Sequence, residues 1–247
     1  MPAISICIPA YGMGGAGATY LAESLDRLCL QTFRDFEVIV SDQSDDEDIA
    51  QLCAAYGDRL SIIHLWNRDA PRQASANVNH AIAAARGTIL KILFQDDLLI
   101  GNNALEIIHD AMSAGAAWSL CGSGVTRDGQ EVTRPMVPRL TDRLHFGKNT
   151  VSSPSVLAMR RDAAMAFDEE LIWLMDVDLY KRLWDRHGAP AIVADTVVAN
   201  RLHDGQVSAS VRKSLRQKEL RYVARKFARS TNLIGWLEYL RQRLKAL

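Results

Sequence analysis

Short apolar runs alternate with amphipathic segments through the first part of the chain. Runs such as 4–10 and 36–41 are continuous and end at turn residues, which favours strands buried within a parallel sheet. Between these runs, apolar residues recur every three or four positions, the spacing of an amphipathic helix. The alternation predicts a doubly wound, mostly parallel α/β sheet flanked by helices. The expected strands are 4–10, 36–41, 60–65 and 89–94, and the expected helices are 19–32, 46–56 and 75–86.

The pattern is less regular in the second half of the chain. The expected elements there are helices at 103–114 and 176–187, strands at 118–126 and 191–200, and an apolar run within 149–159. The segment 127–154 matches no pattern from which we can infer a role. Neither an internal repeat nor a low-complexity linker interrupts the chain, so one large domain is expected.

The fourth apolar run ends abruptly in Gln95, Asp96 and Asp97. In open α/β sheets, ligands bind beyond the carboxyl ends of the strands, which is where these residues are expected. Adjacent carboxylates repel each other unless a cation or hydrogen bonds compensate them, and Mg²⁺ is often held by carboxylates together with substrate phosphates. The pair therefore indicates either a metal and phosphate site or a cap for the next helix.

A glycine-rich loop offers an alternative function. The loop Gly12–Gly17 (GMGGAG) fits the dinucleotide fingerprint, follows a strand and precedes a helix, and the second strand ends at Asp42. Against this, Pro9, Ala10 and Tyr11 intervene between the apolar run and the glycines, and Asp42 lies 30 residues beyond Gly12 rather than about 20. An NAD(P)-dependent oxidoreductase would also leave the two aspartates without a use. It is the weaker interpretation.

Composition narrows the class of protein. Hydrophobic residues make up 48% and charged residues 23% of the chain, and no apolar run approaches the roughly 20 residues that span a bilayer. The amino-terminal segment lacks the basic region of a signal peptide. The four cysteines are dispersed without metal-ligand spacing, which favours reduced core residues and a cytoplasmic protein.

The net charge of zero conceals a strongly basic tail. Eleven Lys or Arg and two Glu lie between Arg212 and Leu247, so this segment carries +9 and the rest of the chain −9. Leucines at 233, 237, 240, 244 and 247 form one apolar helical face. We therefore divide the chain into 1–210 and a basic amphipathic extension, 211–247. The extension either packs on the domain or on a second subunit, or binds an anionic membrane surface from the cytoplasmic side. No nucleic-acid recognition motif accompanies the charge.

Several motifs together resemble family 2 glycosyltransferases of the GT-A fold. They occur in the family's order and extend from Ile4 to Ser208: SICIPAYG, FEVIVSDQSDD, an N-x-A-I helix ending in Arg86-Gly87, ILFQDD, WLMDVDLYKRL and RLHDGQVS. The chain departs from the family pattern at Gly12, where Asn is usual, at Ser41 and Gln43, which replace Asp and Gly, and at Met175, where Glu is common.

The resemblance implies an inverting, metal-dependent transfer of a sugar from a nucleoside diphosphate, with uridine the favoured nucleoside. The acceptor would be a hydroxyl of a surface glycan or glycolipid, and the metal Mn²⁺ or Mg²⁺. The roles carried over are metal binding by Asp97 and His203, ribose or metal-water contact by Asp96, base contacts by Pro9, Tyr11 and Asp42, and phosphate pairing by Arg72.

The same resemblance makes Asp176 the expected general base. Inversion in one step requires a carboxylate that accepts the proton of the attacking hydroxyl. Asp178 is the competing candidate, but on a helix its direction differs by about 200°, so only one of the two can face the site. Trp173, just before this helix, is either a wall for the sugar or a core residue.

Overall fold

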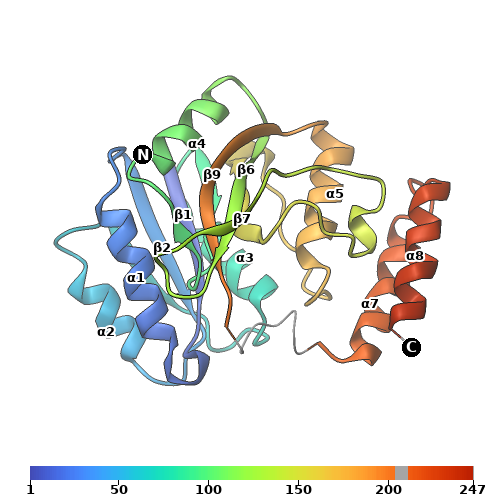
Figure 1. Cartoon of the computed structure of the whole chain (residues 1–247). Helices are drawn as coiled ribbons and strands as arrows, with labels where there is room; N and C mark the ends of the chain where they lie inside the picture. Colours follow the sequence, from blue (N-terminus) through green and yellow to red (C-terminus); the bar gives the residue numbers. More distant parts are fainter. Residues whose placement is uncertain (204–210, 247) are drawn as a thin grey trace.

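The computed structural model describes residues 1–203 and 211–246 and contains one nine-stranded mixed sheet with helices around it (Figure 1). The end of the RLHDGQVS motif, from residue 204, and the expected domain boundary at 210 lie outside the described residues. The strand order is β3-β2-β1-β4-β8-β6-β9-β5, and β7 pairs with β6 off this path. The prediction of an α/β fold is confirmed.

The first half of the sheet is parallel, as its buried apolar runs predict. The strands are β1 (Ile4–Ala10), β2 (Phe36–Asp42), β3 (Ile62–Trp66) and β4 (Ile89–Ile92). The intervening helices are α1 (Gly17–Cys29), α2 (Asp48–Ala55) and α3 (Ala74–Ala84). In the register, Ala10 lies opposite Asp42, and Asp42 opposite Trp66. The strand ends therefore meet at one edge, where the segments after β1, β2 and β4 come together.

The second half of the sheet is mixed. Its strands are β5 (Leu98–Leu99), β6 (Trp118–Thr126), β7 (Thr133–Met136), β8 (Leu157–Arg160) and β9 (Ala191–Arg201). Strand β8 runs antiparallel to both β4 and β6, whereas β9 is parallel to β6 and antiparallel to β5. The helices here are α4 (Ala104–Ser113) and α5 (Met175–His187). Strands β5 and β7 were not predicted, because two and four residues carry too little periodicity.

The basic extension forms two helices beside α5, on the side of the molecule away from α1 and α2 (Figure 1). They are α7 (Lys213–Lys226) and α8 (Leu233–Lys245). Leu220 and Val223 of α7 are fully buried in the common core, so this helix packs on the domain. Helix α8 contacts Phe146 through Trp236 and Tyr239, and turns its leucines outward. Within 1–203 and 211–246, no helix has the length and apolar character needed to cross a membrane.

Candidate active site

A cavity of about 630 Å³ opens at the edge where the parallel strands end. Its walls come from segments far apart in the sequence: Pro9 and Tyr11 after β1, Asp96 and Asp97 after β4, and Asp176 at the start of α5. Seven of the eight site residues expected from the sequence line it, namely Pro9, Tyr11, Arg72, Asp96, Asp97, Asp176 and His203. The exception is Asp42.

Asp97 is buried and held by neutral donors. Its Oδ2 accepts hydrogen bonds from Ser153 Oγ and Asn200 Nδ2, each at 3.0 Å, and its Oδ1 accepts one from the Arg201 backbone N–H at 3.1 Å. Burial and then the neighbouring Asp96 carboxylate raise the pKa of Asp97 to about 7, although the hydrogen bonds oppose this shift. Two close carboxylates in this setting favour the binding of a cation.

Asp96 contacts His203 across the same cavity. Its Oδ2 lies 3.0 Å from His203 Nε2, which joins the end of β4 to the segment after β9. The two residues present oxygen and imidazole donors beside Asp97. Within the described residues, no group of three or more His, Cys, Asp or Glu can hold a metal ion by itself. A divalent cation here needs substrate oxygens to complete its ligands, as is common for Mg²⁺ bound to phosphates.

Gln95 fixes the first loop against the two aspartates. Its Oε1 accepts the Tyr11 N–H at 2.6 Å, and its Nε2 donates to Tyr11 O at 3.0 Å and to Gly17 O at 3.2 Å. A Cβ at Gly17 would lie 2.2 Å from Tyr11 O, so a side chain has no room there. This glycine of the GMGGAG loop is therefore required for packing against Tyr11.

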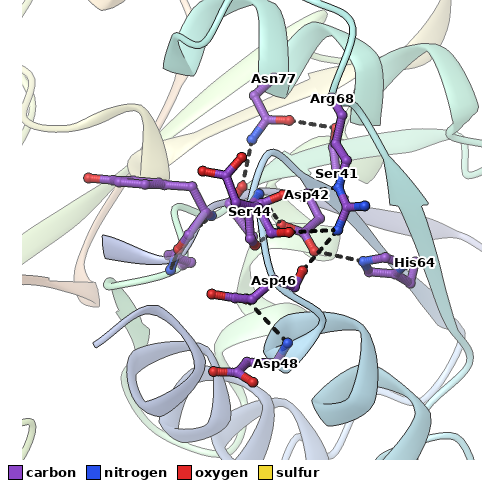
Figure 2. A network of polar contacts seen from close by, with 12 residues as sticks. Ser41, Asp42, Ser44, Asp46, Asp48, His64, Arg68 and Asn77 are labelled. Atoms are coloured by element: carbon purple, nitrogen blue, oxygen red, sulfur yellow. Dashed lines mark hydrogen bonds and ion pairs between the residues drawn. The ribbon is translucent and has the colours of Figure 1, made fainter. Parts of the chain in front are cut away.

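Asp42 lies beside the cavity but does not line it. The side chain is fully buried; its Oδ1 accepts from Ser44 N at 2.8 Å and from the Ser44 hydroxyl, and its Oδ2 accepts from His64 Nε2 at 2.9 Å. Figure 2 shows Arg68 closing the same turn by donating to Ser44 O. Contact of Asp42 with a nucleoside base stays a prediction.

Arg72 sits at the exposed rim of the cavity. Both terminal nitrogens of its guanidinium pair with the Asp45 carboxylate, one of them at 2.9 Å. The two side chains are 60% and 77% exposed, so the pair is readily exchanged for another anion. Pairing of Arg72 with phosphate stays a prediction.

Asp176 is the carboxylate at the other side of the cavity. Asn149 Nδ2 donates to its Oδ2 at 2.8 Å, and the Val177 backbone N–H donates to its Oδ1 at 2.8 Å. Burial raises the pKa of Asp176 to about 7, which these hydrogen bonds only partly offset. A carboxylate with a pKa near neutrality is a suitable general base.

Asp178 has a different environment from Asp176. It is fully buried outside the cavity wall, with Arg182 Nε 2.7 Å from its Oδ2 and Lys226 Nζ 2.7 Å from its Oδ1. The expected divergence of the two side chains on the helix is therefore observed. Asp178 ties α5 to α7, and Asp176 alone of the two reaches the cavity.

Several residues of the site were missed by the sequence analysis. Gln95, Asn149, Ser153, Asn200 and Glu219 each bind a predicted site residue or its backbone neighbours. Only Gln95 had a signal, its position next to the aspartates. The others lie outside every motif of the resemblance or, like Asn200 and Glu219, inside predicted elements whose pattern carries no chemical signal, and the fold brings them to the site.

The cavity at the strand ends brings three aspartates together in an α/β domain, which is the arrangement expected from the family resemblance. The chain belongs to glycosyl transferase family 2, whose model matches residues 5–172. It is 27% identical over 109 residues to the glycosyltransferase GlyG of Streptococcus pneumoniae serotype 4, covering 43% of this chain and 34% of that protein. It is 23% identical over 235 residues to the uncharacterised glycosyltransferase RT0329 of Rickettsia typhi, covering 88% and 70%. The chain thus spans about a third of GlyG's length.

Solved structures of the same fold include two glycosyltransferases with bound donors. S. aureus TarS 1–349 in complex with UDP-GlcNAc superposes with a TM-score of 0.73 at 19% identity, over 98% of this chain and 72% of that one. The mannosyltransferase PcManGT of Pyrobaculum calidifontis, in complex with GDP-Man and Mn²⁺, gives 0.64 at 17% identity, over 93% and 64%. The GT-A fold is confirmed, and the oxidoreductase interpretation of the glycine-rich loop gains no support.

Proposed function

We propose that the chain transfers a sugar from a nucleoside diphosphate, with UDP the favoured carrier, to a hydroxyl acceptor with inversion at the anomeric carbon. The observation that carries this proposal is the cavity that Asp96, Asp97 and Asp176 share. It combines an acidic, phosphate-side pair with a separate carboxylate whose pKa is raised to about 7. The TarS complex contains UDP-GlcNAc, which supports a uridine donor.

The chemistry requires one base and no covalent intermediate. The acceptor oxygen attacks the anomeric carbon as the bond from that carbon to the phosphate oxygen breaks. Asp176 takes the hydroxyl proton, and Asn149 holds the carboxylate in place through its 2.8 Å hydrogen bond. The nucleoside diphosphate leaves with the electron pair of the broken bond, and the sugar is now bonded to the acceptor oxygen.

Asp97, Asp96 and His203 are the residues that would hold Mn²⁺ or Mg²⁺ together with the diphosphate. The ion supplies neutralisation of the charge that develops on the leaving group. The buried Asp97 carboxylate and the partly exposed Asp96 carboxylate repel each other and fit this role, and PcManGT was solved with Mn²⁺. Tyr11 and Pro9 would contact the nucleoside, and Arg72 would exchange Asp45 for phosphate.

The acceptor is proposed to be a cell-surface glycan or glycolipid handled at the cytoplasmic face of a membrane. The support is α8, on which Leu233, Leu237, Leu240 and Leu244 are 74%, 58%, 55% and 70% exposed. Both acidic residues of the extension, Glu219 and Glu238, are buried, so the charge it presents to solvent is cationic. An anionic lipid surface complements this face, whereas a second copy would bring like charges together.

Membrane binding can be tested with vesicles. The chain is expected to sediment with phosphatidylglycerol vesicles and not with phosphatidylcholine vesicles, and Leu237→Ser with Leu240→Ser should abolish the binding. A matched control is Leu30→Ser, which changes an exposed leucine at the end of α1 in the main domain. Equal binding by wild type and the double variant contradicts the proposal, and a leucine-dependent dimer in sedimentation equilibrium would assign the face to a second copy.

The transferase activity is tested by a donor screen. UDP-GlcNAc, UDP-glucose, GDP-mannose and NAD⁺ are added with Mn²⁺ or with a chelator, and thermal stabilisation and donor hydrolysis are measured. A nucleotide sugar that stabilises the chain and is slowly hydrolysed, with inversion seen by NMR of the released sugar, is the expected result. If NAD⁺ stabilises the chain and no nucleotide sugar does, the result favours the oxidoreductase interpretation instead.

A further inference from the structure

The start of α5 lacks a cap of its own. Helix amino termini leave backbone N–H groups unpaired, and the residue at the cap position, Leu174, offers no side-chain acceptor. The segment that leads into the helix is held by another helix instead: Glu219 of α7 accepts hydrogen bonds from the N–H group of Leu174 at 2.8 Å and from those of the two preceding residues, Trp173 at 3.0 Å and Ile172 at 2.9 Å. The three donors are consecutive in the chain.

The charge and burial of Glu219 suit this contact. Glu219 is 1% exposed, so its carboxylate is hydrogen-bonded to these backbone N–H groups in place of water. Burial raises the pKa of Glu219, but the three N–H donors favour the ionised form and oppose the shift. The positive end of the α5 dipole adds to this stabilisation. A neutral side chain of the same size would meet several N–H groups with fewer acceptor lone pairs.

A second contact lies two turns further along α7. Lys226 is seven residues after Glu219, which places both on the same face of the helix. Its Nζ is 2.7 Å from Asp178 Oδ1 and 2.5 Å from Asp168 Oδ2. Glu219 thus binds the turn before α5 while Lys226 binds the first turn of α5, and together they fix both sides of Asp176.

We propose that Glu219 is a positioning residue for sugar transfer, which holds Ile172–Leu174 so that Trp173 and Asp176 face the cavity. The inference rests on the proposed function, because it assigns Asp176 the role of base. Ile172, Trp173 and Asp176 all line the cavity, whereas Glu219 does not. The carboxyl-terminal extension then belongs to the catalytic machinery, although Glu219 acts only through the segment that it holds.

Glu219 also influences the protonation of Asp176. Glu219 of α7 acts on Asp176 through its charge, and within α5 Asp176 in turn raises the pKa of the buried Tyr180 hydroxyl, which burial raises first. Burial is the main cause of the raised pKa of Asp176, and the negative charge of Glu219 adds to it, so removal of that charge lowers the pKa. Asp176 must be ionised to act as the base, so the rate rises with pH as this carboxyl group ionises. When its pKa is lower, this rising limb of the pH–rate profile lies at lower pH.

The test compares Glu219→Gln with Arg221→Gln, an exposed control on the same helix. Hydrogen–deuterium exchange of the peptide that contains 172–174 needs no substrate. We expect exchange about tenfold faster in Glu219→Gln than in the control, the effect of losing roughly one hydrogen bond to a charged acceptor. Hydrolysis of UDP-GlcNAc should show kcat lowered by about tenfold or more, donor KM within about twofold, and the rising limb at lower pH.

Glu219→Asp keeps the test decisive if the amide variant does not fold. This variant retains the charge on a shorter side chain, so exchange should increase while the pH limb stays where it is. If hydrogen–deuterium exchange at 172–174 is unchanged in both variants, the contact of Glu219 with these N–H groups is refuted. If exchange is faster but kcat and the rising limb of the pH–rate profile are those of the wild type, the positioning role is refuted. If the wild type hydrolyses no nucleotide sugar, the proposed function fails and the catalytic part of this inference with it, whereas faster exchange still supports the contact.

Discussion

Replacing Asp176 by Asn should lower activity and raise stability together. Asn keeps the size of the side chain and one acceptor oxygen but cannot take the acceptor's proton. Turnover is expected to fall by about 10²–10⁴, the usual share of general base catalysis. In the proposed function the donor is held mainly by Tyr11, Asp96 and Asp97, so donor KM should barely move. A fall in kcat without a change in donor binding marks an interaction made only in the transition state.

The gain in stability follows from the pKa of Asp176. It is about 7 in the folded chain, against roughly 3.9 for an unfolded aspartate, and this difference of about three units is worth at most about 4 kcal/mol. Because the folded pKa is the higher one, the unfolded state ionises first. Stability is therefore lost progressively as the pH rises from about 4 to about 7, and the loss is constant above that. The Asp176→Asn variant, which has no carboxyl group to ionise at this position, does not carry this cost.

The net effect is smaller because Asn supplies one oxygen to two donors. Asn149 Nδ2 and the Val177 N–H both donate to the carboxylate, and one of these hydrogen bonds is lost, at about 1 kcal/mol. The variant should be about 1–3 kcal/mol more stable at pH 7.5, with a Tm higher by roughly 2–10 °C. Thermal unfolding at pH 7.5 and pH 4 checks this, since the advantage should vanish at pH 4. Full turnover, or a variant less stable at pH 7.5, would refute the reasoning.

Three other variants probe the rest of the site. A nucleotide sugar at a hundredfold excess over its Kd should stabilise the wild type by about 2.7 kcal/mol in the presence of Mn²⁺, and Asp97→Ala should abolish the part of this stabilisation that depends on Mn²⁺. Equal affinity of the wild type with and without metal argues against a metal site. Asp178→Asn should cost about 3 kcal/mol in denaturant unfolding, because Lys226 and Arg182 lose a buried partner, yet reduce turnover far less than Asp176→Asn. Gly17→Ala should destabilise the chain by about 1–3 kcal/mol and weaken donor binding in calorimetry, since its Cβ would press on Tyr11 O; wild-type affinity would show that Tyr11 is not needed.

The sequence predicted the fold and the site best where the residues concerned are close together in the chain. The apolar run before Asp96 and Asp97 predicted a buried parallel strand, and the ends of β1, β2 and β4 were then expected to meet at one edge, as they do. Tyr11, Asp97 and Asp176 all line the cavity, and they could be predicted as site residues because each follows or begins a regular element within a recognisable motif. The divergence of Asp176 and Asp178 also followed from helical geometry alone.

The tertiary structure decided what lies between these motifs. Asn149 and Ser153 occupy an irregular segment, and Asn200 lies at the end of a predicted strand whose partners the sequence does not specify. These residues reach Asp97 and Asp176 because β8 inserts antiparallel between β4 and β6, and β9 pairs with β6. Glu219 lies 43 residues after Asp176 in a segment whose visible property is positive charge. No sequence pattern specifies which backbone N–H groups a buried glutamate will meet.

The basic extension shows the same division between sequence and structure. Its periodicity determined two amphipathic helices, because apolar spacing fixes which residues share a face. It could not determine which face is covered. Packing of α7 on the domain buries Leu220 and Val223, whereas α8 leaves its leucines exposed. That difference depends on the shape and charge of distant surfaces, which exist only once the chain has folded.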